Sequence, residues 1–134
     1  MNRSFDITLK NRAILHRFLV DFSLSQLNTV PDGYRNSIYW NIIHVVVTQQ
    51  LLVYKLSDVP MLIGSDLVDA FRKGTKTERG ATQHEVEHLK KLLFSTIEQT
   101  QKDYDAGRFT SYNSYTVSTK STLTNVEEAI EFNN

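Results

Sequence analysis

The residue types of this chain point to imidazole chemistry, because it contains four histidines and no cysteine. The absence of cysteine excludes disulfide bonds, thiolate nucleophiles and cysteine-based zinc sites. A histidine can still ligate a metal or transfer a proton near neutral pH. His44 lies within the most apolar stretch of the chain, whereas His84 and His88 stand four residues apart in a polar one. These three are the candidates for site residues.

The segment from His84 to His88 reads H-E-x-x-H, the pattern in which two histidines one helical turn apart hold zinc. At about 100° per residue, however, both histidines fall opposite the apolar stripe centred near Val86. Glu85 is accounted for by a T-x-x-E capping box with Thr82. No third ligand follows downstream. We therefore expect an exposed histidine pair rather than a metalloprotease site.

His44 shares a helical face with Asn41 and Thr48, and Trp40 flanks them. A buried imidazole needs partners, because leaving a buried polar group unpaired costs about 1–3 kcal/mol. One interpretation is a core histidine that is satisfied by Asn41, Thr48 or a backbone carbonyl of another helix. The other is a metal ligand or acid–base group at the floor of a pocket between helices. The spacing leaves both open.

Two long helices are predicted in the first half of the chain. The first spans Phe5 to Leu27, and its core stripe comprises Leu15, Phe18, Leu19 and Phe22. Pro31-Asp32-Gly33 then predicts a turn. The second, Tyr34 to Lys55, is apolar almost all round and too long for a typical strand, which favours a buried helix.

The second half predicts a short helix and two further long ones. Ser65 can cap a short helix over 66–73, with Gly74 just past its end, and a polar connector follows. The next helix begins at Thr82, with an inward stripe of Val86, Leu89, Leu93, Ile97 and Tyr104. Beyond Gly107 we expect a long connection or a short hairpin. Thr124 and Glu127 repeat the capping-box pattern before a last helix with Val126, Ala129 and Ile130 facing inward.

Composition places the chain among folded globular proteins, with 40% hydrophobic and 22% charged residues in 134. One domain over residues 1–134 fits this length. The net charge is zero and no run of like charge reaches about five residues, so nucleic acid and anionic membranes are not expected partners. The N-terminus lacks an apolar leader, and no apolar stretch approaches ~20 residues. We expect a cytoplasmic location.

Three stretches in register resemble the DinB-like family. Asn36 to His44 is similar to the family's second-helix motif, in which a tryptophan precedes a histidine by four residues. Phe71 to Lys76 is similar to its segment before the third helix, and Val126 to Asn134 resembles the opening of its fourth. The resemblance implies an all-α, up-and-down four-helix bundle, often a homodimer, whose last helix is incomplete in this chain.

The resemblance also implies a divalent metal, Zn or Ni, held in the central pocket by three histidines. His44 matches the first ligand. The family's other two come from an H-x-x-x-H of the fourth helix, just after the position where this chain ends, and His84 and His88 cannot replace them. Relatives with assigned activity are thiol transferases or other enzymes that use a low-molecular-weight thiol such as bacillithiol or mycothiol. The resemblance therefore implies a thiol transferase or, as a further class, a hydrolase.

Two hypotheses follow from these observations. The first is a metal-binding bundle that acts as a metal- and thiol-dependent transferase on small molecules, with His44 as metal ligand and Trp40, Asn41 and Thr48 as pocket wall. Fold analogy carries this hypothesis. The second is a non-catalytic interaction module without a functional metal site, in which a bundle with an uncovered apolar seam dimerises.

Overall fold

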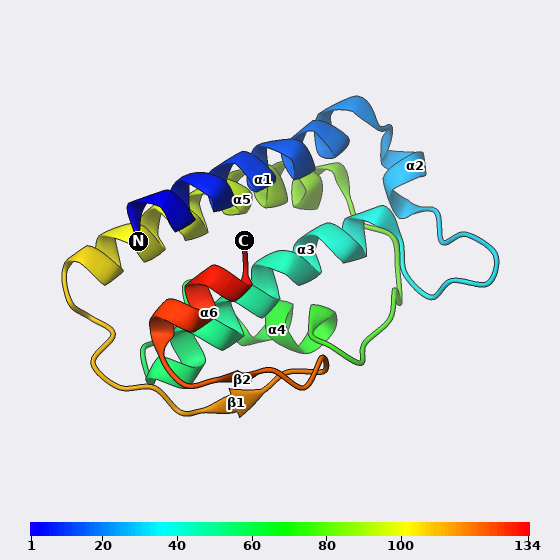
Figure 1. Ribbon diagram of the computed structural model, residues 1–134. Coiled ribbons are helices and arrows are strands. Elements are labelled where there is room, and N and C mark those ends of the chain that lie inside the picture. The colour runs from blue at the N-terminus through cyan, green and yellow to red at the C-terminus, as the bar shows by residue number, and fades with distance from the viewer.

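The chain folds as a set of helices with one small hairpin, and the computed structural model describes all 134 residues (Figure 1). Its helices are α1 (Asn2–Asp21), α2 (Leu24–Asn28), α3 (Ile38–Gln49), α4 (Ser65–Phe71), α5 (Gln83–Asp105) and α6 (Val126–Phe132). The strands are β1 (Tyr115–Thr116) and β2 (Thr122–Leu123). The all-α prediction is confirmed. No helix is long and apolar enough to cross a membrane.

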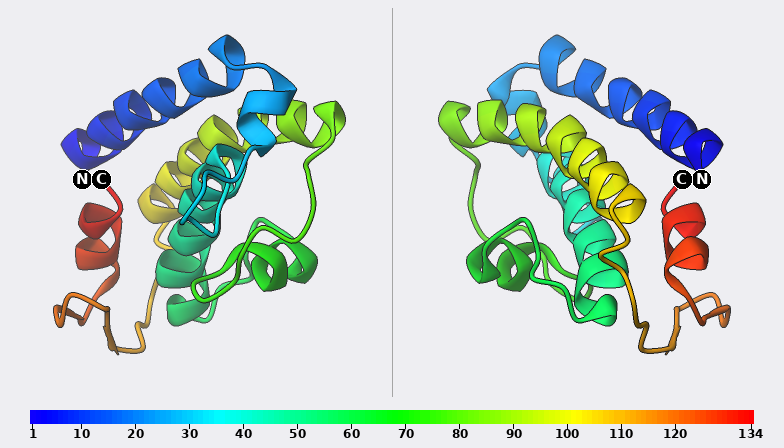
Figure 2. Two further views of the ribbon diagram at one scale, coloured as in Figure 1. Left: turned by 90° about the vertical axis from the view of Figure 1, so that its right-hand side faces the viewer. Right: turned by 90° about the vertical axis from the view of Figure 1, so that its left-hand side faces the viewer.

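Helices α1 and α5 form an antiparallel pair along one side of the molecule (Figure 2). Near one end of the pair the rings of Phe5 and Tyr104 meet edge to face, with centroids 6.1 Å apart. Near its middle the Arg12 guanidinium donates to the backbone carbonyl of Leu93 over 3.1 Å. This pair forms a wall of the bundle, and α3 packs against α5 from the other side.

The long apolar helix predicted over 34–55 is confirmed, although it begins four residues later. Ser37 caps α3 by accepting a hydrogen bond from the backbone N–H of Trp40, so the residues before it lie outside the helix. After Gln49 the helix continues as a π-helical turn, Gln50–Tyr54, and a 3-10 turn, Lys55–Ser57. A π-helical turn is rare and is frequent at functional sites. Here it carries residues of the cavity described below.

Helices α3 and α5 run in the same direction, which differs from simple up-and-down alternation. The start of α3 lies near the residues before α5, because the backbone N–H of Ser37 donates to the Thr77 hydroxyl. Further along both helices, the Gln49 amide donates to the Thr100 hydroxyl. The cause is the crossover over residues 58–82, which carries α4 and returns the chain to the end at which α3 began (Figure 1). This crossover brings α4 against the face of α3 that holds His44.

Capping explains where helix ends differ from prediction. The first helix stops at Asp21 instead of reaching Leu27, because Ser23 and Gln26 form a capping box that starts α2. Helix α4 begins after Gly64, so Ser65 is its first residue and not its cap. For α6 the cap is one residue later than predicted, because the Asn125 side chain accepts from the Glu128 N–H.

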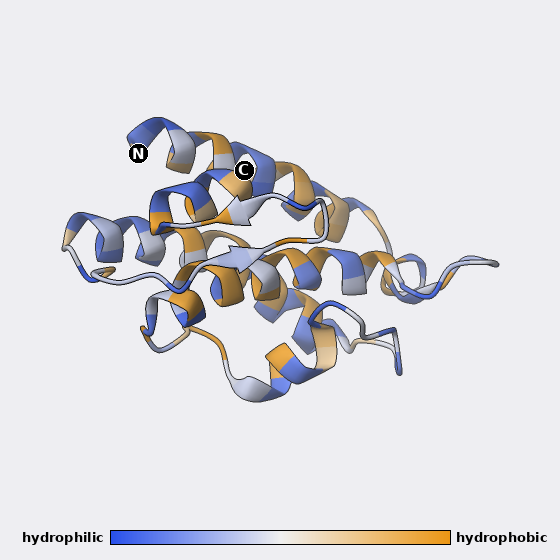
Figure 3. Ribbon diagram, turned by 60° about the horizontal axis from the view of Figure 1, so that its bottom comes forward, coloured by the Kyte–Doolittle hydropathy of each residue, from blue (hydrophilic) through white to orange (hydrophobic).

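The start of α5 is as predicted, with a complete Thr82–Glu85 capping box. Two sets of buried apolar residues form the core between these helices, and the hydropathy colouring shows apolar positions concentrated on inward faces (Figure 3). The inward stripe of α5 is confirmed for Val86, Leu89, Leu93 and Ile97, whereas Tyr104 is only partly buried. The inward residues of α6, Val126, Ala129 and Ile130, are also confirmed.

The predicted stripe of the first helix is partly wrong. Leu19 is buried and Leu15 and Phe22 pack beside it, but Phe18 is 42% exposed. The buried face of α1 runs instead through Phe5, Thr8, Arg12 and Leu19. An apolar-only stripe could not identify this face, because two of its four buried positions are polar.

Beyond Gly107 the sequence predicted either a long connection or a short hairpin, and the structure contains a short hairpin before α6. Strands β1 and β2 pair antiparallel, with Tyr115 opposite Leu123 and Thr116 opposite Thr122. Val117 and Leu123 are buried against the core, so the hairpin covers one end of the bundle. It also brings β1 toward the extension of α3, because the Tyr112 hydroxyl just before it donates to the Leu52 carbonyl over 2.7 Å.

Candidate functional site

His44 is half-buried on α3 and held in one orientation by a backbone carbonyl. Its Nδ1 lies 2.6 Å from the carbonyl oxygen of Phe71, the last residue of α4. A carbonyl can only accept, so Nδ1 carries the proton and donates it. In the neutral ring, Nε2 then holds the lone pair. The contact also satisfies one of the carbonyls that a helix leaves unpaired at its C-terminus.

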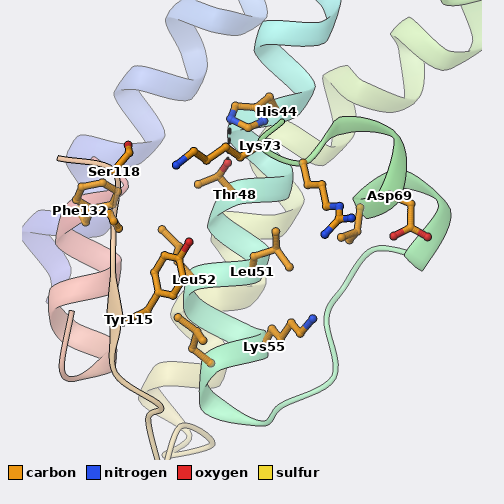
Figure 4. Close-up of a pocket in the computed structure, with 14 residues that line it drawn as sticks. His44, Thr48, Leu51, Leu52, Lys55, Asp69, Lys73, Tyr115, Ser118 and Phe132 are labelled. Atoms are coloured by element: carbon orange, nitrogen blue, oxygen red, sulfur yellow. Dashed lines mark hydrogen bonds between the residues drawn. The ribbon is translucent and has the colours of Figure 1, made fainter. Parts of the chain in front are cut away.

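Nε2 faces the side chain of Thr48, one helical turn further along α3. The hydroxyl oxygen lies 3.4 Å from Nε2, at the long limit of a hydrogen bond (Figure 4). A weak contact of this kind leaves Nε2 able to accept a proton or bind a cation. The histidine is thus oriented through one nitrogen and presents the other.

Trp40 fixes the plane of the imidazole. The two rings stack with centroids 4.5 Å apart and planes 13° apart. The indole Nε1 donates to the Thr75 hydroxyl over 3.2 Å, and that hydroxyl donates to the Arg72 carbonyl over 2.7 Å. The segment after α4 therefore holds the Trp40–His44 pair from outside the helix.

A cavity of about 550 Å³ lies beside His44 and Thr48 (Figure 4). The extension of α3 contributes Leu51, Leu52, Lys55 and Leu56 to its wall, and α4 with the residues after it contributes Val68, Asp69, Arg72 and Lys73. The hairpin region and α6 complete it with Tyr115, Val117, Ser118 and Phe132. Its volume is in the range of sites for small organic ligands, roughly 300–1,000 Å³.

Of the three residues predicted to form the pocket wall, one lines the cavity and two do not. Thr48 lines the cavity. Trp40 is buried behind His44 and is not part of the lining. Asn41 is exposed and outside the lining, because its side-chain amide turns back to donate to the Ser37 carbonyl over 2.9 Å. Of the partners considered for His44, a backbone carbonyl of another helix makes the short contact, Thr48 makes a long one, and Asn41 makes none.

Sequence reasoning missed the charged and C-terminal parts of the lining. Lys55, Arg72 and Lys73 belong to segments that only the crossover brings together, and Tyr115 and Phe132 follow much later in the chain. No local pattern marks these residues. The one sequence signal near them was the resemblance over 71–76, which contains Arg72 and Lys73.

The pair His84 and His88 is exposed on α5, as predicted. Glu85 between them is engaged in structure: its carboxylate pairs with Arg79 at 2.7 Å and accepts the backbone N–H of Thr82 at 2.9 Å. The hydrogen bond from Arg79 lowers the pKa of Glu85 to about 2. A carboxylate so occupied is a helix cap rather than the general base of a protease.

Of the three histidine ligands that the resemblance implies for a metal, this chain contains one, His44. The chain contains no group of three or more histidine, cysteine, aspartate or glutamate side chains that could hold a metal ion. His44 nevertheless has the arrangement that metal-binding histidines adopt, with one ring nitrogen donating to a carbonyl and the other in only a long contact with the Thr48 hydroxyl. It fits the role of one ligand and does not form a closed site within residues 1–134.

One buried cation lies away from the cavity. Arg12 is 1% exposed, and its Nη1 donates to the carbonyl of Leu93 while its Nη2 has no partner. Burial lowers the pKa of Arg12 to about 10. No carboxylate pairs with this guanidinium.

Comparison with known proteins gives one clear result. No curated protein and no solved structure matches the chain. The sequence model of the DinB superfamily matches residues 8–134. This span includes α3, the crossover and α6, and therefore every element that surrounds His44 and the cavity. The chain belongs to the DinB superfamily.

Proposed function

We propose that the protein binds small molecules in the cavity beside His44 and uses the Nε2 of His44 as one ligand of a divalent metal, Zn or Ni. The finer assignment, a metal- and thiol-dependent transferase, is the activity we propose for this site. Membership of the superfamily supports the proposal by analogy of fold and is not evidence of a reaction.

The observation that carries the proposal is the orientation of His44. A histidine buried only for packing could use both nitrogens within the core. Here Nδ1 donates to Phe71, the ring is stacked on Trp40, and Nε2 is left beside a cavity with a long contact to Thr48. Such an outer hydrogen bond fixes the tautomer and raises the basicity of a metal-binding imidazole.

A bound divalent cation would act as a Lewis acid and lower the pKa of a thiol or water in the cavity. The residues of the chain orient His44 and form the surroundings of a bound ligand. Phe71 holds the proton on Nδ1, Trp40 holds the ring plane, and the apolar wall around Leu51 and Leu52 excludes water from a ligand. Lys55, Arg72 and Lys73 add positive charge around the same space.

Metal binding tests the proposal. Zinc or nickel is titrated into the protein without a dialysis step, because a single histidine holds metal only weakly, and His44→Ala and a double variant His84→Gln/His88→Gln are titrated beside it. We expect His44→Ala to bind the metal more weakly and the double variant to bind it as the parent protein does, because only His44 faces the cavity. Equal metal affinity of the parent protein and His44→Ala would contradict the proposal.

A second candidate is the non-catalytic dimerisation module, and one feature of α1 favours it. Ile7, Ile14 and Phe18 are spaced by seven and four residues, so they share one face of the helix. They are 37%, 58% and 42% exposed. A second copy of the chain would cover this apolar face. A dimer in sedimentation together with no effect of His44→Ala on metal binding would favour this candidate over the first.

A further inference from the structure

The wall of the cavity carries an excess of positive charge. Lys55 comes from the 3-10 turn after α3, and Arg72 and Lys73 come from the segment after α4, whereas Asp69 is the one carboxylate of the lining. None of the three cations lies within 4.0 Å of a carboxylate oxygen in an ion pair. The whole chain has zero net charge, so this local excess does not follow from its composition.

The segment that bears two of these cations is fixed. The backbone N–H and the hydroxyl of Thr75 both donate to the Arg72 carbonyl, over 3.1 and 2.7 Å. The same hydroxyl accepts from the Trp40 indole, which ties the turn to α3. Arg72 and Lys73 therefore extend from an ordered turn beside His44, so less entropy is lost when an anion binds them.

Most of the rest of the wall is apolar. Seven of the 14 lining residues are hydrophobic, including Leu51, Leu52, Val68 and Phe132. Figure 4 shows Lys73 toward the end of the cavity that holds His44 and Thr48, Lys55 toward the other end, and Leu51 and Leu52 between these ends. This arrangement offers contact for a hydrocarbon body and positive charge for an acidic group.

We propose that the cavity selects organic anions, in the form of a carboxylate attached to an apolar body. The carboxylate interacts with Arg72 and Lys73, and with Lys55 when the molecule is long enough to reach it, while the body packs on the leucine wall. A guanidinium and an ammonium together complement a carboxylate in charge and hydrogen bonding. This inference rests on the proposed function, because it assumes that the cavity is the ligand site. It adds the chemical class of the ligand.

Octanoate, octanol and octylammonium probe this selectivity, because they share an apolar chain and differ in charge. Isothermal titration of the whole protein measures the affinities, and NMR shifts of His44 and Thr48 place each probe in the cavity. We expect octanoate to bind best. We also expect Arg72→Gln/Lys73→Gln to weaken octanoate about tenfold and to leave octanol unchanged. Lys91→Gln, an exposed position of α5 outside the cavity, is the matched control.

Equal affinity for octanoate and octanol would overturn the inference, as would an equal loss in the double variant and in Lys91→Gln. Inorganic phosphate that binds as tightly as octanoate would also overturn it, because the apolar body would then contribute nothing. These results leave the metal test of His44 unaffected. If octanol binds in the cavity as tightly as octanoate, only the inference is overturned. If no probe binds and the parent protein binds metal no better than His44→Ala, both the inference and the proposed function are overturned.

Discussion

At the scale of single residues, His44 and Arg12 differ in what surrounds their side-chain nitrogens. His44 has a hydrogen-bond partner for one nitrogen and a cavity for the other. Arg12 is enclosed on all sides, keeps its charge without a carboxylate, and leaves Nη2 without a partner. A buried unpaired charge lowers the free energy of unfolding, because its lost hydration is not replaced. Of these two bases, only His44 has a nitrogen beside a cavity, where it can bind a ligand.

Arg12→Met tests the cost of this buried charge. Methionine is apolar and flexible enough to occupy much of the same space, so we expect the free energy of unfolding to rise by roughly 1–2 kcal/mol. Urea unfolding near neutral pH measures the change. The control is Arg3→Met, an exposed position of the same helix, for which we expect less than about 0.5 kcal/mol. A clear loss of stability in the Arg12 variant would show that the guanidinium stabilises the protein.

At the scale of elements, the predictions that succeeded rest on local signals. The Thr82–Glu85 pattern located the start of α5, and its apolar spacing located the buried face. The predictions that failed involve competition between neighbouring residues of similar chemistry. Asn125 caps α6 in place of Thr124, and the Ser23 box divides what reads as one helix into α1 and α2. Propensity cannot rank such neighbours, because tertiary packing decides between them.

The stability that Glu85 contributes at the N-terminus of α5 depends on pH. The Glu85 pKa of about 2 is below its ordinary value of 4.5, so the carboxylate contributes stability above about pH 4.5 that is lost as the pH falls toward 2. Glu85→Gln keeps a capping acceptor but removes the pairing with Arg79. We expect this variant to be about 1 kcal/mol less stable near neutral pH and to lose less stability on acidification.

Urea unfolding at neutral and acidic pH measures both effects. Glu98→Gln is the control, because Glu98 is exposed on the same helix and makes no ion pair. The interpretation of Glu85 as a structural carboxylate would be wrong if its variant responded to acid like the parent protein and like the control.

At the scale of the molecule, the cavity is a product of topology. Its wall combines the extension of α3, α4, the residues around β1 and the end of α6, which are separated by long stretches of sequence. Periodicity predicted most of these helices, and the resemblance to DinB-like proteins placed His44 among the site residues. Neither indicated that α3 and α5 run parallel or that Lys55 faces the segment of Arg72. Those relations depend on the crossover, which carries no periodic signal of its own.

The protonation and ligation of the two nitrogens of His44 can be measured directly. NMR of protein with nitrogen-15 in its histidines, in the His84→Gln/His88→Gln background, reads each nitrogen without interference from the exposed pair. We predict a proton on Nδ1 before and after zinc is added, and a zinc-dependent shift of Nε2. A proton on Nε2, or an Nε2 signal that zinc does not shift, would contradict the proposal that this nitrogen binds a metal.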